Sequence, residues 1–564
     1  MRYLRTVGLI LASCIVGLAA AQHGHTELDV NGAAGTVPLF EGLGDYTLPI
    51  TTTSTLAQRY FDQGLMFVYG FDHFEAARSY RAAIEHDERC AMCHWGLALA
   101  LGPHINAAMD PDAVPEAFEA SQRALELAAD VSDRERAYIE ALAERYGPEV
   151  LEDRSRLDLA YVDAMREVVA AYPDDLDAAT LFAEALMNLI PWNYWDAYGE
   201  PRTETVELVA TLESVLARDP YHPGANHHYI HAVEASPAPE RAEGAADRLV
   251  ELDIQIGHMI HMPSHIYARI GRWHDASSAN ERAIVADHAY LAAYEAEGLV
   301  PLLYHPHNVH FLSWTAGVEG RRALALEAAE DVVAATPAEL AADLPFLNGF
   351  LVTPLYGMVR FEMWDEILDE TVDADPHGFV TAAWHFARGR AYAGLGRPDE
   401  AANEAAALQA IASSEAASDW EMPEAFFPGR TLLGLMQDLL AADLAVVAGD
   451  LDEAAQLLER AVATQDQLPY MEPPYWSVSA RLDLGRVLLA AGRYQDAVQV
   501  YQADLEVYPS NGWALFGLAQ ALEASGDDVA AEEVWDQFEE VWRHADVDLQ
   551  VDEGGIGVAA SPSE

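Results

Sequence analysis

Histidine is the residue type in this chain whose number and spacing indicate a chemical role, namely metal binding. Twelve of the 21 histidines lie between residues 222 and 310. His227 and His231 are four residues apart and Glu234 follows three residues later, so a helix would place all three side chains on one face. Two imidazoles one helical turn apart bind a divalent metal together, and a carboxylate on the same face completes or orients its coordination shell. This segment therefore predicts a metal site.

Two further segments repeat this spacing. His258, His261 and His265 follow one another at intervals of three and four, and His307 and His310 are three residues apart. In a helical repeat array these segments would be neighbours on one concave face. Many histidines and few thiols favour zinc, copper, iron or nickel over calcium or magnesium, and the sequence does not choose among the four. The alternative interpretation is a hydrogen-bonded polar core or a pH-responsive network. The predicted metal ligands are His227, His231, Glu234, His258, His261, His265, His307 and His310.

A second candidate site is the string Cys90-Ala91-Met92-Cys93-His94. Cys-x-x-Cys-His is the attachment motif of c-type haem, in which both thiols bind the porphyrin and the histidine is the proximal iron ligand. His104 and Met109 are candidates for the sixth ligand. The residues after the motif continue as an apolar helix, which offers a ridge and not a haem pocket. A local disulfide, a bound metal and a free dithiol are therefore the other interpretations of Cys90 and Cys93.

An aromatic cluster at Trp192, Tyr194 and Trp195 falls between two expected helices. Tryptophan and tyrosine combine apolar faces with hydrogen-bond donors, so such clusters line ligand grooves. The alternative is a packed loop between two repeats.

The charged residues exclude several functions. The chain has 564 residues, of which 92 are acidic and 32 basic, for a formal net charge of −60. All the basic residues are arginines, so mechanisms that need a lysine Schiff base, a Walker A lysine or the protein-kinase lysine are excluded. Such an acidic chain would also be repelled by nucleic acid and by anionic membranes, and it would attract cations. The acidity by itself is typical of solubility or adaptation to salt.

The N-terminus reads as an export signal. Residues 1–21 contain Arg2 and Arg5, then an apolar stretch, then three alanines that end at Ala21. The sequence therefore predicts a periplasmic or extracellular protein. A lipid anchor at Cys14 is the competing interpretation, because the residues before Cys14 resemble a lipobox. No later apolar stretch is long enough to span a membrane, so we expect no integral membrane segment.

The elements that position these residues are predicted by an internal repeat. The pattern has small residues where two paired helices touch and aromatic residues that fill the gaps to the next pair. The last copy contains Trp513, Phe516, Gly517, Gln520 and the Ala530-Ala531 pair. Earlier copies contain Gly485, Leu488, Gly492, Ala497, Tyr501 and Pro509; Gly449, Ala454, Leu458 and Ala461; Gly389, Tyr392, Gly396 and Ala401; Tyr267, Gly271, Ala276 and Ala283; and Gly64, Phe67, Ala76, Tyr80 and Ala83.

On these residues the sequence resembles the tetratricopeptide-repeat (TPR) family over most of residues 55–545, with degenerate stretches near 110–220 and 290–375. The resemblance implies an all-α fold, a TPR α-solenoid of antiparallel helix pairs whose concave face binds a protein or peptide partner. The histidine-rich stretches are similar to those of a subset of bacterial exported TPR proteins. The predicted organisation is a signal peptide (1–21), an extended arm (22–54), an N-terminal TPR-like array with a histidine-rich centre (55–330), a C-terminal TPR array (331–550) and a flexible tail (551–564).

The function predicted from these features is an exported scaffold that binds a partner or ligand on its concave face and carries a histidine-lined transition-metal site. One alternative is a metal-dependent hydrolase in which Glu234 acts as the base. The other is a mono-haem electron-transfer protein that uses Cys90, Cys93 and His94. The sequence contains no nucleophile elbow, glycine-rich dinucleotide turn or His-Glu-x-x-His string, so a binding role is preferred to an enzymatic one.

Overall fold

The chain divides into two compact units. A computed structural model describes residues 37–294, 298–337, 344–372, 378–414, 427–552 and 555–558. The N-terminal unit comprises Met1–Ile266 and Arg282–His305, and the C-terminal unit comprises Tyr267–Glu281 and Pro306–Glu564. The C-terminal unit includes residues 267–281 and 306–330, whereas the predicted N-terminal array extends to residue 330; the bounds of the arrays stay a prediction. The predicted signal peptide and Cys14 lie outside the described residues.

Packing between two helices explains this difference. Helix α14 (Trp273–Ala293) begins in the C-terminal unit, where it packs on α15 (His305–Val318). The Ser277 hydroxyl donates to Glu319 at 2.6 Å and lies 2.9 Å from the Thr315 hydroxyl, and the Trp273 and Trp314 rings meet edge to face at 5.3 Å. These contacts join the start of α14 to the C-terminal unit, which sequence spacing does not reveal.

Helix pairs build the N-terminal unit. Its helices include α2 (Thr55–Tyr69), α3 (His73–His86), α4 (Ala91–Ala100), α5 (Val114–Leu127), α6 (Asp133–Ala143), α7 (Ser155–Ala171), α8 (Leu176–Leu189), α9 (Thr203–Arg218), α10 (Pro223–Val233), α11 (Glu243–Leu252), α12 (Gly257–His261) and, across the division, α13 (Pro263–Arg269). Short segments η1 (Pro111–Ala113), η2 (Ala128–Asp130), η3 (Pro239–Ala242) and η4 (Val300–Tyr304) complete it. The described part of the arm, residues 37–54, has no helix or strand and is bound by contacts such as the Gln255 amide on the Gly42 carbonyl, at 2.8 Å.

Local sequence explains why these pairs form and pack. Ser54 and Asp72 cap α2 and α3 by accepting hydrogen bonds from backbone amides in the first turn of each helix. The buried ring of Tyr80 then packs against glycines on two other helices. A Cβ atom would lie 2.8 Å from this ring at Gly64 and 2.2 Å at Gly96, so only glycine allows the approach. The predicted small and aromatic positions are therefore the ones that set the spacing of the helices.

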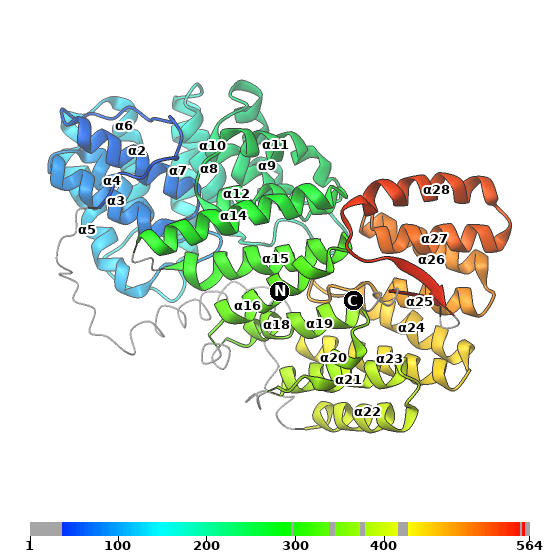
Figure 1. The fold of residues 1–564 in the computed structure, drawn as a ribbon. Helices are drawn as coiled ribbons and strands as arrows, with labels where there is room; N and C mark the ends of the chain where they lie inside the picture. Colours follow the sequence, from blue (N-terminus) through cyan, green and yellow to red (C-terminus); the bar gives the residue numbers. More distant parts are fainter. Residues whose placement is uncertain are drawn as a thin grey trace. The chain divides into compact units, whose positions relative to one another are not determined.

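The C-terminal unit continues as successive helix pairs from α21 to α28 (Figure 1). Its helices after α15 are α16 (Arg322–Ala335), α18 (Asn348–Leu351), α19 (Thr353–Arg360), α20 (Trp364–Asp369), α21 (Phe379–Gly394), α22 (Pro398–Ala412), α23 (Gly429–Val447), α24 (Leu451–Gln465), α25 (Ala480–Ala490), α26 (Tyr494–Val507), α27 (Gly512–Ser525) and α28 (Asp528–Val541), with short segments η5 (Pro345–Leu347) and η7 (Trp542–His544). The predicted all-α array of helix pairs is confirmed.

A short hairpin follows the last helix. Strands β1 (Leu549–Asp552) and β2 (Gly555–Val558) pair antiparallel, with Leu549 opposite Val558 and Val551 opposite Ile556. The hairpin includes part of the predicted tail, residues 551–564, and the tail stays a prediction. None of the helices in the described residues is long and apolar enough to cross a membrane.

Many turns between consecutive helices contain a residue with positive φ, and in several of them this residue is not glycine. In most of these turns the residue with positive φ is a glycine, as at Gly271, Gly320, Gly396, Gly449, Gly492 and Gly526. Phe71 between α2 and α3, with φ of 57°, and Glu362 between α19 and α20, with φ of 53°, take the same place. A side chain in this conformation costs roughly 1–2 kcal/mol. Such strain concentrates at functional sites, so both turns are of interest.

Candidate metal centre

Helix α10 places His227 and His231 in the interior of the N-terminal unit. Pro223 occupies the first turn, and Nδ1 of the His222 ring caps the helix by accepting from the Ala225 amide at 3.2 Å. Every residue of α10 is buried. The two histidines therefore face protein on all sides, which the helical spacing alone does not indicate.

Three histidines converge there. One ring nitrogen from each of His227, His231 and His258 lies within 4.8 Å of the other two. Nε2 of His227 and Nε2 of His258, which comes from α12, are 3.2 Å apart. All three side chains are buried, with His227 fully inaccessible. We call these three residues the histidine triad.

Hydrogen-bond contacts at Nδ1, the ring nitrogen that faces away from the centre of the triad, orient His227 and His231. The Tyr69 carbonyl oxygen can only accept, so Nδ1 of His227 carries the proton it donates, and Nε2 keeps its lone pair. Nδ1 of His231 lies 3.2 Å from Oε1 of Glu234, and Nε2 of His231 is buried without a hydrogen-bond partner among the described residues. A metal-binding histidine commonly donates its other nitrogen to a carbonyl or carboxylate in this way.

Burial favours the neutral form of His227 and His231. Burial is the main cause that lowers the pKa of His227 and of His231 well below the ordinary value, and the neighbouring imidazoles lower it further. The pKa of the adjacent His228 is lowered in the same way. A metal binds the neutral form of histidine, so these nitrogens are available to a metal at neutral pH.

Phe71 stands at the centre of a wider ring of histidines. Its side chain is 1% exposed, and it contacts the rings of His227, His228, His231, His258 and His104 at centroid distances of 4.6, 5.2, 5.8, 6.1 and 5.4 Å, respectively. On another side, Tyr304 stacks on His258 at 4.4 Å. The triad is thus enclosed by aromatic rings that exclude water.

Glu234 lies in a position to orient the triad, which is one of the roles that the sequence predicts for it. Its contact is with Nδ1 of His231, and its second oxygen, Oε2, lies 3.1 Å from Nδ1 of His265. Because Nδ1 and Nε2 lie on different sides of an imidazole, this carboxylate orients His231 from behind. The roles of Glu234 as a metal ligand and as a base stay predictions.

His261 and His265 form a separate pair. Their Nε2 atoms are 2.9 Å apart, and the Ser264 hydroxyl lies 3.3 Å from Nδ1 of His261. The remaining two predicted ligands, His307 and His310, belong to α15 of the C-terminal unit. His307 contacts the Phe311 ring at 5.8 Å, and His310 contacts Phe350 at 5.0 Å. Among the described residues of the N-terminal unit, the triad is therefore the group of three predicted ligands whose ligand atoms all lie within 4.8 Å of one another.

The predicted haem motif contains a disulfide. Cys90 and Cys93 are joined, both are fully buried, and Sγ of Cys90 accepts from the Cys93 amide at the start of α4. The ring of His94 lies 3.1 Å from the Glu88 carbonyl. A disulfide was one of the interpretations left open by the sequence. Because thioether attachment needs both thiols, a haem and this disulfide are mutually exclusive, and the haem stays a prediction.

The aromatic cluster packs beside α10. Tyr194 is buried, and the Trp195 indole donates to the Ala232 carbonyl at 2.8 Å. Trp192 has φ of 59°, is 42% exposed and meets the His231 ring edge to face at 5.2 Å. Tyr194 and Trp195 thus pack beside α10 and Trp192 covers one side of the triad, and the ligand groove stays a prediction.

Several residues of the site escape sequence reasoning. Tyr69 and Tyr304 carry no signal, and His73 and His104, whose rings lie 4.3 Å apart, fall outside the histidine-rich window. Phe71 does carry one, because it occupies a turn position where most other copies have glycine.

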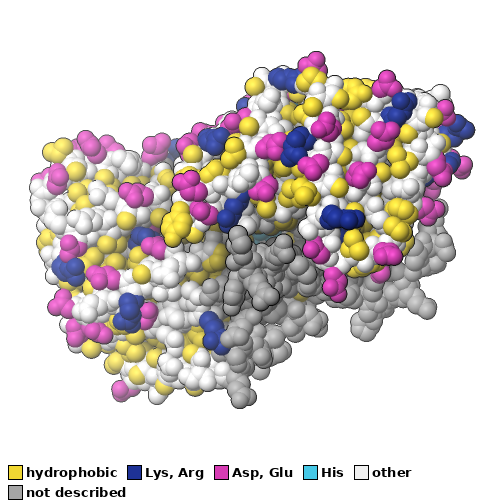
Figure 2. All heavy atoms as spheres, turned by 180° about the vertical axis from the view of Figure 1, so that it is seen from behind, with side chains coloured by type: hydrophobic (Ala, Val, Ile, Leu, Met, Phe, Trp, Pro, Cys, Tyr) yellow, Lys and Arg dark blue, Asp and Glu magenta, His cyan; other side chains and the backbone are white. Residues whose placement is uncertain are grey.

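On the face seen in Figure 2, acidic side chains are scattered among arginines and almost no histidine appears, in agreement with the burial of the cluster.

Comparison with known proteins identifies the repeats. A family model described as tetratricopeptide repeat matches residues 439–503 and 482–539, which extend from within α23 to α28. Residues 439–539 of the C-terminal unit therefore match tetratricopeptide repeats. No curated protein matches the chain.

Solved structures with similar helical arrays include the human IFIT1 dimer with m7Gppp-AAAA (10% identity, 87% of this chain and 91% of that chain, TM-score 0.30). The yeast Tom70 structure is also similar (13% identity, 86% and 92%, TM-score 0.27), as is the APC/C hetero-tetramer Cut9-Hcn1 (11% identity, 87% and 90%, TM-score 0.30). TM-scores this low do not establish a shared fold, so the repeat assignment rests on the family match and on the helix pairs themselves.

Proposed function

We propose that this chain is an exported TPR protein that binds a divalent transition metal through Nε2 of His227, His231 and His258, and that its repeats dock a protein or peptide partner. The observation that carries the proposal is the buried, unpartnered Nε2 of His231 beside two other imidazole nitrogens. The predicted signal segment supports export, and the TPR architecture supports a protein partner.

The main competing interpretation is a hydrogen-bonded polar core. Without a metal, Nε2–H of His258 satisfies the lone pair of His227, but Nε2 of His231 is left buried without a donor. An unsatisfied buried polar group costs about 1–3 kcal/mol. A metal satisfies all three nitrogens at once, so the geometry favours a metal site over a purely structural network.

The donor set narrows the metal. Three neutral imidazole nitrogens suit zinc, copper, iron or nickel. Nδ1 of two of these rings contacts a carbonyl or a carboxylate, which is typical of metal-binding histidines. Calcium and magnesium take oxygen ligands and do not suit this donor set. Three protein ligands also leave a coordination position open, as in sites where a metal binds a further ligand. The scaffold would then present that position beside Trp192.

The test is elemental analysis of the full chain, expressed with its N-terminal segment and purified from the periplasm. We expect about one transition metal per chain, and we expect His231→Ala and His258→Ala to lose it. The matched control is His385→Ala, because Nδ1 of His385 lies 2.6 Å from Oε2 of Glu404 but no triad surrounds it. Folded protein that neither contains nor takes up metal would overturn the proposal, as would metal content unchanged in His231→Ala. A Soret band in the visible spectrum would instead assign a haem to Cys90 and Cys93.

A further inference from the structure

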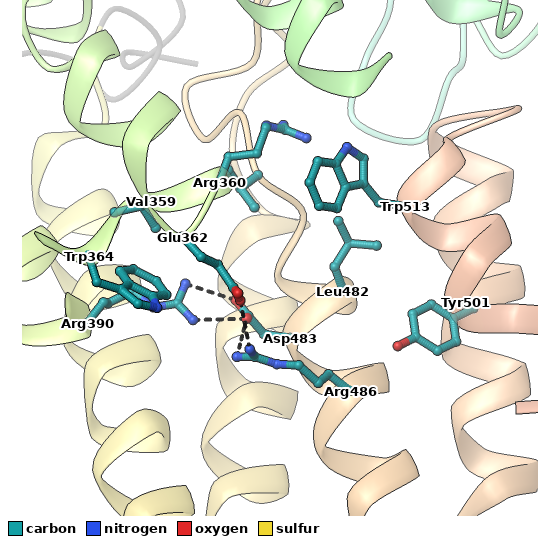
Figure 3. A pocket seen from close by; sticks show the side chains of 11 residues that line it. Val359, Arg360, Glu362, Trp364, Arg390, Leu482, Asp483, Arg486, Tyr501 and Trp513 are labelled. Carbon is teal, nitrogen blue, oxygen red and sulfur yellow. Dashed lines mark hydrogen bonds and ion pairs between the residues drawn. The ribbon is translucent and has the colours of Figure 1, made fainter. Parts of the chain in front are cut away.

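The C-terminal unit contains a pocket that no feature of the triad explains (Figure 3). Three arginines contribute to its wall, which are Arg360 at the end of α19, Arg390 on α21 and Arg486 on α25. Trp513 on α27 and Leu482 on α25 supply apolar surface. In a chain with only 32 basic residues, three arginines around one hollow are unusual.

Two of these arginines are already neutralised. Arg390 forms ion pairs with Asp443 at 2.7 Å and with Asp483 at 2.9 Å. Arg486 forms ion pairs with Asp483 at 3.1 Å and with Glu362 at 3.3 Å. Figure 3 shows this network on one side of the pocket, opposite Trp513. These two guanidinium groups therefore have no unmet charge.

Arg360 is different. No carboxylate of the described residues lies within 4.0 Å of its guanidinium group, which donates to the Ser477 carbonyl. Burial lowers its pKa to about 10, although Tyr508 and Asp504 act in the opposite direction. The group is still charged at neutral pH, so it is a partly buried cation without a paired anion, which is costly unless an anion joins it.

Two further observations mark the same pocket. The Tyr501 hydroxyl is buried and has no hydrogen-bond partner among the described residues. Figure 3 shows its oxygen directed toward the side where Asp483 and Arg486 lie. Glu362, between Arg360 and Trp364, holds the strained left-handed conformation that glycine takes in the equivalent turns. Strain of this kind is retained where the surroundings need the side chain.

We propose that this pocket binds a carboxylate that is attached to a small apolar group, with the carboxylate on Arg360 and the apolar part against Trp513 and Leu482. A guanidinium group matches a planar carboxylate with two parallel hydrogen bonds. Glu362 and Asp483 would repel a dianionic phosphate more strongly than a singly charged carboxylate. The pocket volume of about 70 Å³ equals the space of roughly five water molecules, which suits a short side chain.

Such a carboxylate could belong to a free acid or to the C-terminal residue of a peptide. Isothermal titration of the full chain at neutral pH therefore uses four probes, namely isovalerate, isovaleramide, the tripeptide Ala-Ala-Leu and its C-terminal amide. We expect the two carboxylates to bind and the two amides not to bind. Tighter binding of the tripeptide than of isovalerate would identify a peptide C-terminus, and the reverse would identify a free acid.

Variants test the role of Arg360. Arg360→Gln should weaken carboxylate binding by about 10–100-fold. Arg460→Gln is the matched control, because Arg460 is exposed and paired with Asp438 at 2.7 Å, and it should bind as the unmodified chain does. Arg360→Lys keeps the charge and should retain part of the affinity, which separates a lost contact from a lost fold; circular dichroism checks that each variant is folded. Equal binding of acids and amides, no binding by the folded chain, or full affinity in a folded Arg360→Gln variant would each overturn the proposal.

Discussion

The conformation of Phe71 leads to a quantitative prediction about stability. Its ring is 1% exposed and its φ is 57°, in a turn where other helix pairs have glycine. Two substitutions separate the ring from the backbone strain. Phe71→Ala removes the ring and keeps a Cβ atom in the left-handed conformation. Phe71→Gly removes the ring and the strain together.

The expected magnitudes follow from these two contributions. Loss of a buried phenylalanine ring destabilises a protein by about 3–5 kcal/mol. Phe71→Gly also relieves the left-handed strain, which stabilises it by roughly 1–2 kcal/mol relative to Phe71→Ala. The greater freedom of glycine in the unfolded chain reduces this stabilisation by about 0.5–1 kcal/mol. Phe71→Gly should therefore be more stable than Phe71→Ala by about 1 kcal/mol, although both are less stable than the unmodified chain.

Hydrogen exchange of α2 and α3, followed by mass spectrometry, is the appropriate assay. A chain of two units need not unfold in a single step, and amide exchange reports the opening free energy of the helices that flank Phe71. Gly396→Ala supplies a control for strain alone. Its φ is 68° and a Cβ atom there would meet nothing within 4 Å, so it should destabilise the turn between α21 and α22 by about 1 kcal/mol. If Phe71→Ala is as stable as Phe71→Gly, the strain argument is refuted.

Three further predictions concern the metal, the helix packing and the response to acid. Glu234→Gln should lower metal affinity by about 10–100-fold in a chelator competition, because Glu234 orients His231. The control variant Glu404→Gln should leave the affinity unchanged. Equal affinities of the two variants would contradict the orienting role. Gly517→Ala should destabilise the chain by about 1–3 kcal/mol in calorimetry, because its Cβ atom would lie 2.3 Å from Cζ of Tyr501. Gly434→Ala is the control on α23, where a Cβ atom meets nothing within 4 Å, and it should stabilise the chain by about 1 kcal/mol because alanine favours a helix. Burial lowers the pKa of His73 from 6.5 to about 4, with Arg145 acting in the same direction. Below pH 6.5 the unfolded chain binds a proton at His73 that the folded chain does not. The free energy of unfolding therefore falls as the pH is lowered toward 4, by up to about 3 kcal/mol from His73. The urea midpoints at pH 7 and pH 4.5 should differ less in a His73→Leu variant than in the unmodified chain.

The sequence predicted the helix-pair array because its signals are local. The repeat is marked by glycines on the helices that pack against Tyr80 and Tyr501. Helix starts are marked by capping residues such as Asp72, which lies directly before α3. The same local reasoning placed His227 and His231 on one face of a helix. It left the pairing of Cys90 and Cys93 open, since a disulfide and a haem require the same spacing.

Long-range packing decided the composition of the two candidate sites. His258 joins His227 only because α12 packs near α10, and Phe71 reaches both from a turn more than 150 residues earlier in the chain. The environment of Arg360 likewise depends on α19 and α25 lining one pocket, in which Asp483 is already bound to two other arginines. The spacing of residues along a helix determines which side chains share a face, but the faces that meet are selected by the burial of apolar surface between helices far apart in sequence. For that reason the sequence by itself determined the helical array and the helix face that His227 and His231 share, and only the tertiary structure decided which three histidines converge and which arginine lacks a paired carboxylate.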